Sequence, residues 1–202
     1  MPLQQTNLKI LIVEPNPLLQ VGLSTILKEN YPNAVISVAD TVQKANSIIC
    51  KDTVDLVILE SDIDNYDGFN LIQKINIEQR HCKVLCYSNA NLKLASSLAH
   101  QLGAKGFIDK NASANEIISA INCLLAGFFL FKSDNETDIM KLSRREKMVF
   151  LYLSKGLTNK QISTKLFLSE KTVSTYKVRL LKKLNCSSLM NLMPYQENLI
   201  SS

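Results

Sequence analysis

Short apolar runs alternate with helical patterns over the first 125 residues of this 202-residue chain. The runs are rich in Val, Ile and Leu with hardly a polar position, which is typical of strands that are buried on both faces of a parallel sheet. Between the runs, apolar residues recur at the spacing of helices that bury one face. The pattern predicts five strands, at residues 8–13, 34–38, 55–59, 83–87 and 106–108.

A helical stretch follows each predicted strand. The first helix is expected from about Pro17 to Glu29, because proline is well suited to the first turn of a helix. The second begins after Asp40-Thr41 and ends near Lys51. Five strand–helix units fit one doubly wound α/β domain with a parallel sheet. In such a sheet the working site lies at the carboxyl ends of the strands.

The pattern changes after a polar stretch without apolar periodicity at residues 132–138, which predicts a linker. Beyond it the chain is helical throughout, as in an all-α four-helix domain. Gly156 stands where a helix C-cap is expected, and Thr158 and Ser169 stand at N-cap positions. Helices are predicted at residues 143–155, 159–167, 170–184 and from about 187. We therefore expect a first domain at 7–126, a linker at 127–140 and a helical domain at 141–196.

Charge separates the two predicted domains. Residues 139–202 contain 12 Lys/Arg and three acids, a balance of +9, whereas residues 1–138 contain 11 Lys/Arg and 15 acids, a balance of −4. This asymmetry indicates a polyanionic partner for the second domain. Residues 168–179 place five hydroxyl-bearing side chains and three cations on one short helix. A helix that enters a DNA groove needs these groups.

Composition argues against several classes of protein. No apolar run reaches the roughly 18–20 residues that span a bilayer, and residues 1–8 lack the pattern of a secretory signal. The five cysteines form no CxxC or CxxxH pairing, and there are only two histidines. We expect reduced thiols in a cytoplasmic protein, with no disulfide, metal, cofactor or membrane contact.

The predicted helices at 159–167 and 170–184 form a helix-turn-helix. Apolar residues at helical spacing would make its core: Ile162, Leu166, Val173, Leu180 and Leu184. Exposed faces would then present side chains suited to base edges and thymine methyls: Lys171, Ser174, Thr175, Val178 and Lys182. Phosphate contacts suit Lys160, Lys177, Arg179 and Lys183, and Thr158 and Asn159 complete the predicted DNA-binding set. The alternative is a solvated basic face on a protein-binding helical bundle.

Four motifs in this region resemble the LuxR/NarL-type DNA-binding domain over residues 140–195. They are Leu142-Ser143-x-Arg145-Glu146, Gly156-x-Thr158-Asn159-Lys160-x-Ile162-Ser163, Leu168-Ser169-Glu170-x-Thr172-Val173 and Lys183-Leu184. Residues 173–177 and 187–192 are similar to the branch of the family that contains EvgA, BvgA and FimZ. The resemblance implies that the helix at 172–184 enters the major groove and that the last helix helps to pair two protomers.

Residues 7–126 resemble the receiver domain of response regulators, which implies a flavodoxin-like strand order. Glu14 matches the acidic pair after the first strand, and Glu60 stands at the position of the phosphoacceptor Asp, with Asp67-Gly68 following. Three further positions match the switch hydroxyl, the switch aromatic and the lysine that meets the phosphoryl group: Ser88, Phe107 and Lys110.

Two departures from the receiver pattern argue against efficient phosphotransfer. Pro15 offers no ligand where the second acid of the pair is expected. Because Mg²⁺ is usually held through only one or two carboxylates, the loss of one should weaken its binding. Glu60 is one methylene longer than Asp, and a misplacement of about 1 Å can lower a rate about 100-fold. Two interpretations of Glu60 stay open. In the first, its carboxylate reaches Ser88 and Lys110 and imitates a phosphorylated Asp. In the second, Glu60 is an acid left in a site that has lost its function, and it is paired to Lys110 without a regulatory role.

These patterns predict a sequence-specific, DNA-binding transcription regulator of the two-component type, independent of Asp phosphorylation and not an enzyme. Its expected partners are double-stranded DNA, a second copy of the chain, and a sensor kinase or RNA polymerase. The dimer contact is expected around Ser188, Leu189 and Leu192. Two alternatives remain: a regulator driven by a sensor kinase, with Glu60 modified or Asp62 used instead, and a protein-binding co-regulator without specific DNA recognition.

Overall fold

The computed structural model describes residues 7–89, 92–131 and 141–184. The chain divides into two compact units, and each is described by itself. The first comprises residues 1–90 and 102–131, and the second comprises residues 91–101 and 132–202. The predicted linker at 132–138 and the predicted helix from about residue 187 lie outside the described residues.

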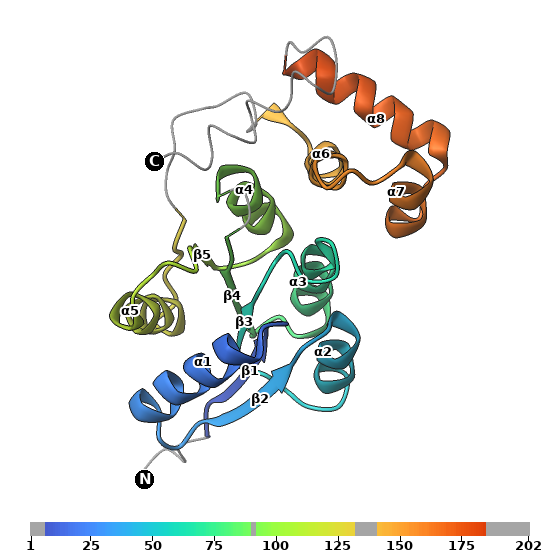
Figure 1. The fold of residues 1–202 in the computed structure, drawn as a ribbon. Coiled ribbons are helices and arrows are strands. Elements are labelled where there is room, and N and C mark those ends of the chain that lie inside the picture. The colour runs from blue at the N-terminus through green and yellow to red at the C-terminus, as the bar shows by residue number, and fades with distance from the viewer. Residues whose placement is uncertain (1–6, 90–91, 132–140, 185–202) are drawn as a thin grey trace. The chain divides into compact units, whose positions relative to one another are not determined.

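The first unit is built on a parallel sheet with the strand order β2-β1-β3-β4-β5 (Figure 1). In the central part of the register, Ile12 of β1 pairs with Val38 of β2 and with Ile58 of β3. The strands are β1 Lys9–Val13, β2 Val35–Ala39, β3 Leu56–Leu59, β4 Lys83–Tyr87 and β5 Gly106–Ile108. Each overlaps its predicted range, so the doubly wound five-stranded sheet is confirmed.

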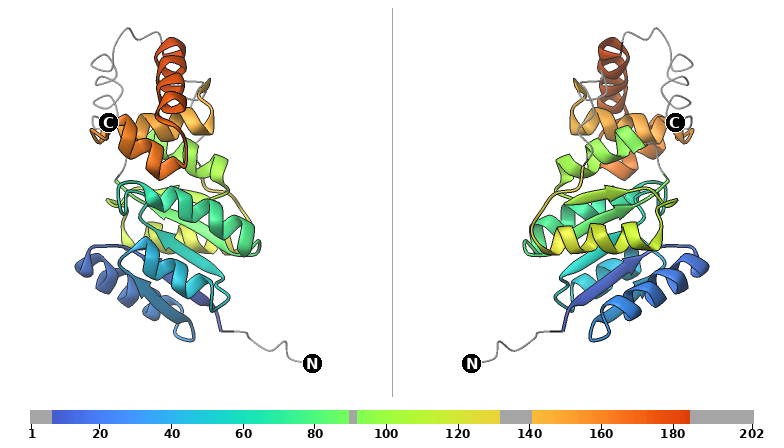
Figure 2. Two further views of the ribbon diagram at one scale, coloured as in Figure 1. Left: turned by 90° about the vertical axis from the view of Figure 1, so that its right-hand side faces the viewer. Right: turned by 90° about the vertical axis from the view of Figure 1, so that its left-hand side faces the viewer.

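Helices cover both faces of this sheet. The view on the right of Figure 2 shows α1 and α5 in front of the sheet, and the view on the left shows α2 and α3. One core cluster joins Ile10 and Ile12 of β1 to Leu27 of α1 and Ile121 of α5, and all four side chains are fully buried. The helices that cover the sheet are α1 Pro17–Asn30, α2 Val42–Ile49, α3 Asp67–Glu78 and α5 Ala114–Leu125. Helix α4, Leu92–Leu102, belongs to the second unit except for its last residue.

The chain continues along the edge of the sheet after α5. The N–H of Phe107 donates to the carbonyl of Leu130 over 3.0 Å, and the N–H of Leu130 donates to the carbonyl of Lys105 over 2.9 Å. Leu130 thereby forms a parallel bridge with Gly106. The first residues of the predicted 127–140 linker therefore pair with β5.

The second unit contains three helices of the C-terminal region: α6 Arg144–Ser154, α7 Asn159–Leu166 and α8 Glu170–Lys183. The predicted core is confirmed, because its five side chains are buried: Ile162, Leu166, Val173, Leu180 and Leu184. Gly156 follows α6 with φ of 76°, and Phe167 ends α7 with φ of 54°, so both turns use left-handed backbone. No described helix has both the length and the apolar character of a membrane span.

Candidate nucleic-acid interface and acidic pocket

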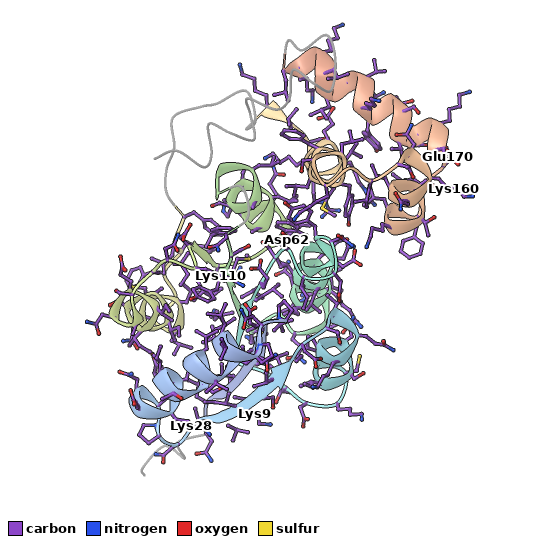
Figure 3. All side chains as sticks on the ribbon, in the orientation of Figure 1. Lys9, Lys28, Asp62, Lys110, Lys160 and Glu170 are labelled. Carbon is purple, nitrogen blue, oxygen red and sulfur yellow. The ribbon has the colours of Figure 1, made fainter. Side chains whose placement is uncertain are left out.

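An acidic pocket lies at the carboxyl ends of the strands of the first unit. Glu14 follows β1, Glu60 follows β3, Ser88 follows β4 and Lys110 comes soon after β5. Parallel strands end at the same edge of a sheet, so residues far apart in the sequence meet there. Figure 3 labels Lys110 near this edge together with Asp62, which comes two residues after Glu60.

Lys110 connects two carboxylates in this pocket. Its Nζ lies 2.6 Å from Oε2 of Glu14 and 2.7 Å from Oε2 of Glu60. The side chains of Glu14 and Glu60 are 2% and 8% exposed. Burial disfavours the charged ammonium, but its hydrogen bonds to Glu14 and Glu60 outweigh that effect and raise the pKa of Lys110. The lysine is therefore held protonated between the two acids.

The remaining carboxylate oxygens also have partners. The hydroxyl of Ser88 donates a short hydrogen bond to Oε1 of Glu60, and the N–H of Asp62 donates to the same oxygen over 2.7 Å. Oε1 of Glu14 accepts from the N–H of Asn16 over 2.9 Å. The hydroxyl of Ser61 donates to Oγ of Ser88 over 2.9 Å. Glu60 is thus bonded to both residues that the sequence proposed, Ser88 and Lys110.

The segment after Glu60 contains unusual backbone and one tight approach. Asp64, Asn65 and Tyr66 all have positive φ, and Oδ2 of Asp64 accepts from the N–H of Val42 at the start of α2 over 3.0 Å. A Cβ at Gly68 would lie 2.8 Å from the carbonyl oxygens of Glu60 and Ser61. Glycine at this position therefore allows α3 to approach the backbone that carries Glu60.

In the second unit, hydrogen bonds fix the ends of the helices. Thr158 caps α7: its Oγ1 accepts from the N–H of Gln161 over 3.3 Å, while Oε1 of Gln161 accepts from the N–H of Thr158 over 2.9 Å. Ser169 caps α8 by accepting from the N–H of Thr172 over 3.0 Å. Ser, Thr and Asn are preferred at such ends because their side chains satisfy free backbone N–H groups. The predicted N-caps are confirmed.

The exposed surface of α8 is basic. The predicted contact residues that are exposed to solvent are Thr158 at the N-cap of α7, Lys160 on α7, and, on α8, Lys171, Thr175, Val178, Arg179, Lys182 and Lys183. Lys177 is half-buried. Glu170 is the only acid on this helix. Figure 3 labels Lys160 and Glu170 close together where α7 meets α8. A polyanion that meets this surface would therefore contact mainly cations.

Several predicted contact residues bond to other side chains of the unit. Ser174 is half-buried, and its Oγ accepts a hydrogen bond from Nδ2 of Asn159 over 3.1 Å, which connects the first turn of α7 to α8. Nζ of Lys183 lies 2.7 Å from Oε2 of Glu146 and donates to the carbonyl of Lys141 over 3.3 Å. Burial raises the pKa of Glu146, but hydrogen bonds from Lys183 and Ser143 outweigh it and lower the pKa overall.

Comparison with known proteins connects both regions to one family. Residues 10–122 match the response regulator receiver domain, and residues 140–195 match the bacterial regulatory proteins of the luxR family. The chain belongs to the LuxR-family response regulators. These proteins are DNA-binding transcription factors of two-component systems and are not enzymes.

Named relatives of this response regulator span almost its whole length. The Fimbriae Z protein of Salmonella typhimurium is 30% identical, covering 94% of this chain and 96% of the relative. BvgA of Bordetella pertussis is 33% identical, covering 91% and 94%. A solved structure of RcsB from Salmonella enterica serovar Typhimurium, bound to promoter rprA, has a TM-score of 0.78 and 20% identity, covering 95% of this chain and 99% of that chain. At 20% identity, the similarity to the RcsB structure shows that the two proteins share a fold.

Two features of this pocket bear on the binding of a divalent cation. Both acids are bonded to Lys110, and the position next to Glu14 is Pro15, whose side chain has no ligand atom. Mg²⁺ requires near-octahedral oxygen coordination. Within the described parts of the chain, no group of three or more His, Cys, Asp and Glu residues is placed to hold a metal ion.

Sequence reasoning missed two buried polar residues of this response regulator. Ser61 is fully buried and bonds to Ser88, and its place directly after Glu60 at the end of β3 was the available signal. Lys147 is also fully buried, in the second unit, where its Nζ donates to Oγ of Ser97 over 2.6 Å. In the sequence, Lys147 looks like an ordinary surface lysine, so no signal there predicted its burial. Phe107, the predicted switch aromatic, is half-buried on β5.

Proposed function

We propose that this response regulator binds DNA sequence-specifically without phosphorylation of its receiver, because Glu60 holds the pocket in a fixed arrangement. The observation that supports this most directly is the pair of contacts from Glu60 to Lys110 and Ser88. Lys110 and Ser88 are the lysine and the hydroxyl that, in the receiver pattern, contact the phosphoryl group. The carboxylate of Glu60 therefore takes the contacts that phosphorylated Asp would make.

The expected effect of this mimicry is limited by charge. A phosphoryl group carries about −1.5 to −2 charges at pH 7 and three acceptor oxygens, whereas a carboxylate carries one charge and two oxygens. A hydrogen bond to a charged group contributes roughly 1.5–3 kcal/mol, and only the part that differs between two states can shift their equilibrium. Loss of the Glu60 charge should consequently change DNA affinity several-fold.

The proposed DNA interface comprises α8 and the first turn of α7. Exposed cations on α8 support phosphate contacts by Arg179 and its neighbours, and the exposed Thr175 and Val178 support base contacts. We propose a homodimer on DNA, since the similar protein RcsB is described as dimers bound to DNA. Domains at 7–126 and 141–196 joined by a linker at 127–140, and action in the cytoplasm, complete the proposal.

The test combines phosphotransfer with DNA binding. The full-length protein is treated with acetyl phosphate and Mg²⁺ and its intact mass is measured, and its DNA affinity is measured before and after treatment. We expect no mass increase for the parent, and a several-fold loss of affinity for Glu60→Gln, which keeps the shape and removes the charge. Glu60→Asp should not restore phosphorylation, because Pro15 still supplies no ligand. Glu60→Asp combined with Pro15→Asp is the variant expected to accept phosphate.

Three results separate the alternatives. Phosphate uptake by the parent that disappears in Asp62→Asn would establish the kinase-driven alternative with Asp62 as acceptor. Equal DNA affinity of the parent and Glu60→Gln, with no uptake by either, would leave Glu60 as a retained acid without regulatory effect. Binding that is weak and indifferent to base sequence would instead favour the protein-binding co-regulator.

A further inference from the structure

Four of the exposed side chains of α8 form a stripe. Lys171, Thr175, Val178 and Lys182 are all exposed, and they follow one another at intervals of four, three and four residues. Residues at this spacing lie on one face of a helix. The buried positions Val173 and Leu180 lie off this stripe and belong to the core. The stripe therefore belongs to the solvent-exposed side of α8.

The middle of this stripe is apolar and its two ends are cationic. Val178 has no polar side-chain atom, and it is 65% exposed. The hydroxyl of Thr175 donates to the carbonyl of Lys171 over 3.0 Å, inside the helix. Its proton is therefore already engaged, and the methyl of Thr175 remains for a partner. Lys171 and Lys182 place ammonium groups at the two ends.

Within the stripe, the two middle side chains, Thr175 and Val178, offer no unengaged hydrogen-bond donor. The exposed Arg179 beside them is assigned to phosphate contacts. Ser174, the neighbouring hydroxyl, is half-buried and accepts from Asn159. Val178 is also the one exposed large apolar side chain among the described parts of α6, α7 and α8, since Phe167 lies in the turn between α7 and α8. At the centre of this face, the side chains therefore favour an apolar contact with the DNA over recognition of bases by hydrogen bonds.

Base edges in the major groove offer one apolar group, the C5 methyl of thymine. Three residues of helix advance by about 4.5 Å, at roughly 1.5 Å per residue. This is comparable with the spacing of about 3.4 Å between base pairs. The side chains of Thr175 and Val178 would consequently face neighbouring base pairs, while the lysines at the ends of the stripe lie toward the phosphates.

We infer that Thr175 and Val178 form a methyl-recognition surface that selects DNA sites carrying thymines at two neighbouring base pairs, through their C5 methyl groups. This inference rests on the proposed sequence-specific DNA binding and adds the chemical group that is recognised. It assigns the main part of this discrimination to Val178, because its side chain is wholly apolar.

The experiment removes single methyl groups from the DNA. Preferred sites are first selected from a random duplex pool with the full-length protein. Each thymine of the selected site is then replaced by deoxyuridine, which lacks only the C5 methyl, and the dissociation constant is measured. Two neighbouring positions should each lose about fourfold in affinity, which corresponds to about 0.8 kcal/mol for a buried methyl-sized group. A cytosine at such a position should gain affinity when replaced by 5-methylcytosine.

Variants assign this effect to a side chain. Val178→Ala keeps an exposed helical position with a residue of higher helix propensity, so the fold should be retained. It should bind the thymine and deoxyuridine sites almost equally at the position that Val178 faces. Lys182→Ala is the matched control: it should weaken both sites alike and keep the fourfold ratio between them.

The outcomes distinguish this inference from the proposed function. If the parent selects a defined site but binds the thymine and deoxyuridine duplexes equally, methyl recognition is wrong while sequence-specific binding stands. Retention of the full ratio in Val178→Ala would likewise overturn the assignment to Val178. If selection yields no preferred sequence, the proposed sequence-specific function itself fails.

Discussion

Two lysines in this protein are removed from water in different electrostatic surroundings. Lys110 lies between the carboxylates of Glu14 and Glu60, and its pKa is raised. Lys147 donates to the hydroxyl of Ser97, and burial lowers its pKa from 10.5 to about 8. A carboxylate compensates the desolvation of an ammonium, whereas a neutral hydroxyl does so only in part. The residue opposite the charge therefore decides the direction of the shift.

Lys147 should make the stability of the protein depend on pH in the alkaline range. Below about pH 8 the folded and unfolded chains both carry the proton, and the penalty for burying the charge is constant. From about pH 8 to 10.5 the folded chain releases the proton while the unfolded chain keeps it, so stability rises. Lys147→Met should raise the free energy of unfolding at pH 7 by roughly 1–3 kcal/mol, and this gain should shrink toward pH 10.5.

Denaturant titrations followed by circular dichroism at several pH values would measure this difference. Lys51→Met, at an exposed position after α2, is the control and should leave both the stability and its pH dependence nearly unchanged. An equal pH dependence for the parent and Lys147→Met would contradict the assignment.

At the scale of elements, contacts near helix ends position the surfaces that carry function. Lys183, in the last turn of α8, pairs with Glu146 in the first turn of α6, which is also held by a capping box with Ser143. Asn159, in the first turn of α7, bonds to Ser174 in the middle of α8. These contacts fix α8 against both neighbouring helices, so its exposed stripe has a defined orientation within the unit.

Gly68 and Gly22 should respond in opposite directions to the same added methyl. Gly68→Ala would place Cβ 2.8 Å from two carbonyl oxygens, so α3 must shift away from β3, and we expect the stability to fall by about 1–3 kcal/mol. Gly22 lies inside α1 with no atom within 4 Å of the added Cβ, and Gly22→Ala should stabilise the protein by about 0.5–1 kcal/mol. Denaturation midpoints of both variants measure the contrast. Similar effects of the two substitutions would disprove the tight approach at Gly68.

At the scale of the whole molecule, the position of the charge matters more than its total. The net charge of the chain is only +5, but α8 carries five cations and one acid. DNA binding releases counterions in proportion to the number of phosphates that are neutralised. The salt dependence of DNA affinity should thus report the cations of α8 rather than the net charge.

Arg179→Ala and Lys28→Gln test this expectation, since each removes one positive charge from an exposed position. Arg179→Ala should lower the slope of log K against log salt concentration by about one and weaken all sequences alike. Lys28, on α1, should leave the slope unchanged. Equal slope changes in the two variants would mean that net charge, and not the α8 surface, controls binding.

Association should involve the predicted last helix around Leu189, which lies outside the described residues. Two recognition helices of a dimer contact half-sites about 34–36 Å apart. Leu189→Asp should reduce affinity for a full site and leave affinity for an isolated half-site unchanged, as measured by gel-shift titration. Arg179→Ala should weaken both. Full-site binding by Leu189→Asp as tight as that of the parent would exclude this contact.

Local patterns in the sequence are enough to predict the elements and the set of candidate residues. Strands, helices, N-caps and the helix-turn-helix core follow from apolar spacing and capping chemistry, which depend on neighbours a few residues away. Their boundaries agree with the structure within a few residues; α1, for example, begins at Pro17 as expected. The sequence also indicated that Glu60, Ser88 and Lys110 share one edge of the sheet.

The partner that each polar group takes depends on how distant parts of the chain pack together. Lys110 and Glu14 are 96 residues apart, and Lys183 and Glu146 are 37 apart, so no local pattern specifies their contacts. Ser174 and Val178 both belonged to the predicted base-contacting set, yet one is bonded to Asn159 and the other is exposed. The burial of Lys147 likewise depends on packing within its unit. Periodicity encodes which face of an element is buried, whereas the partner of a buried charge depends on how the elements pack together.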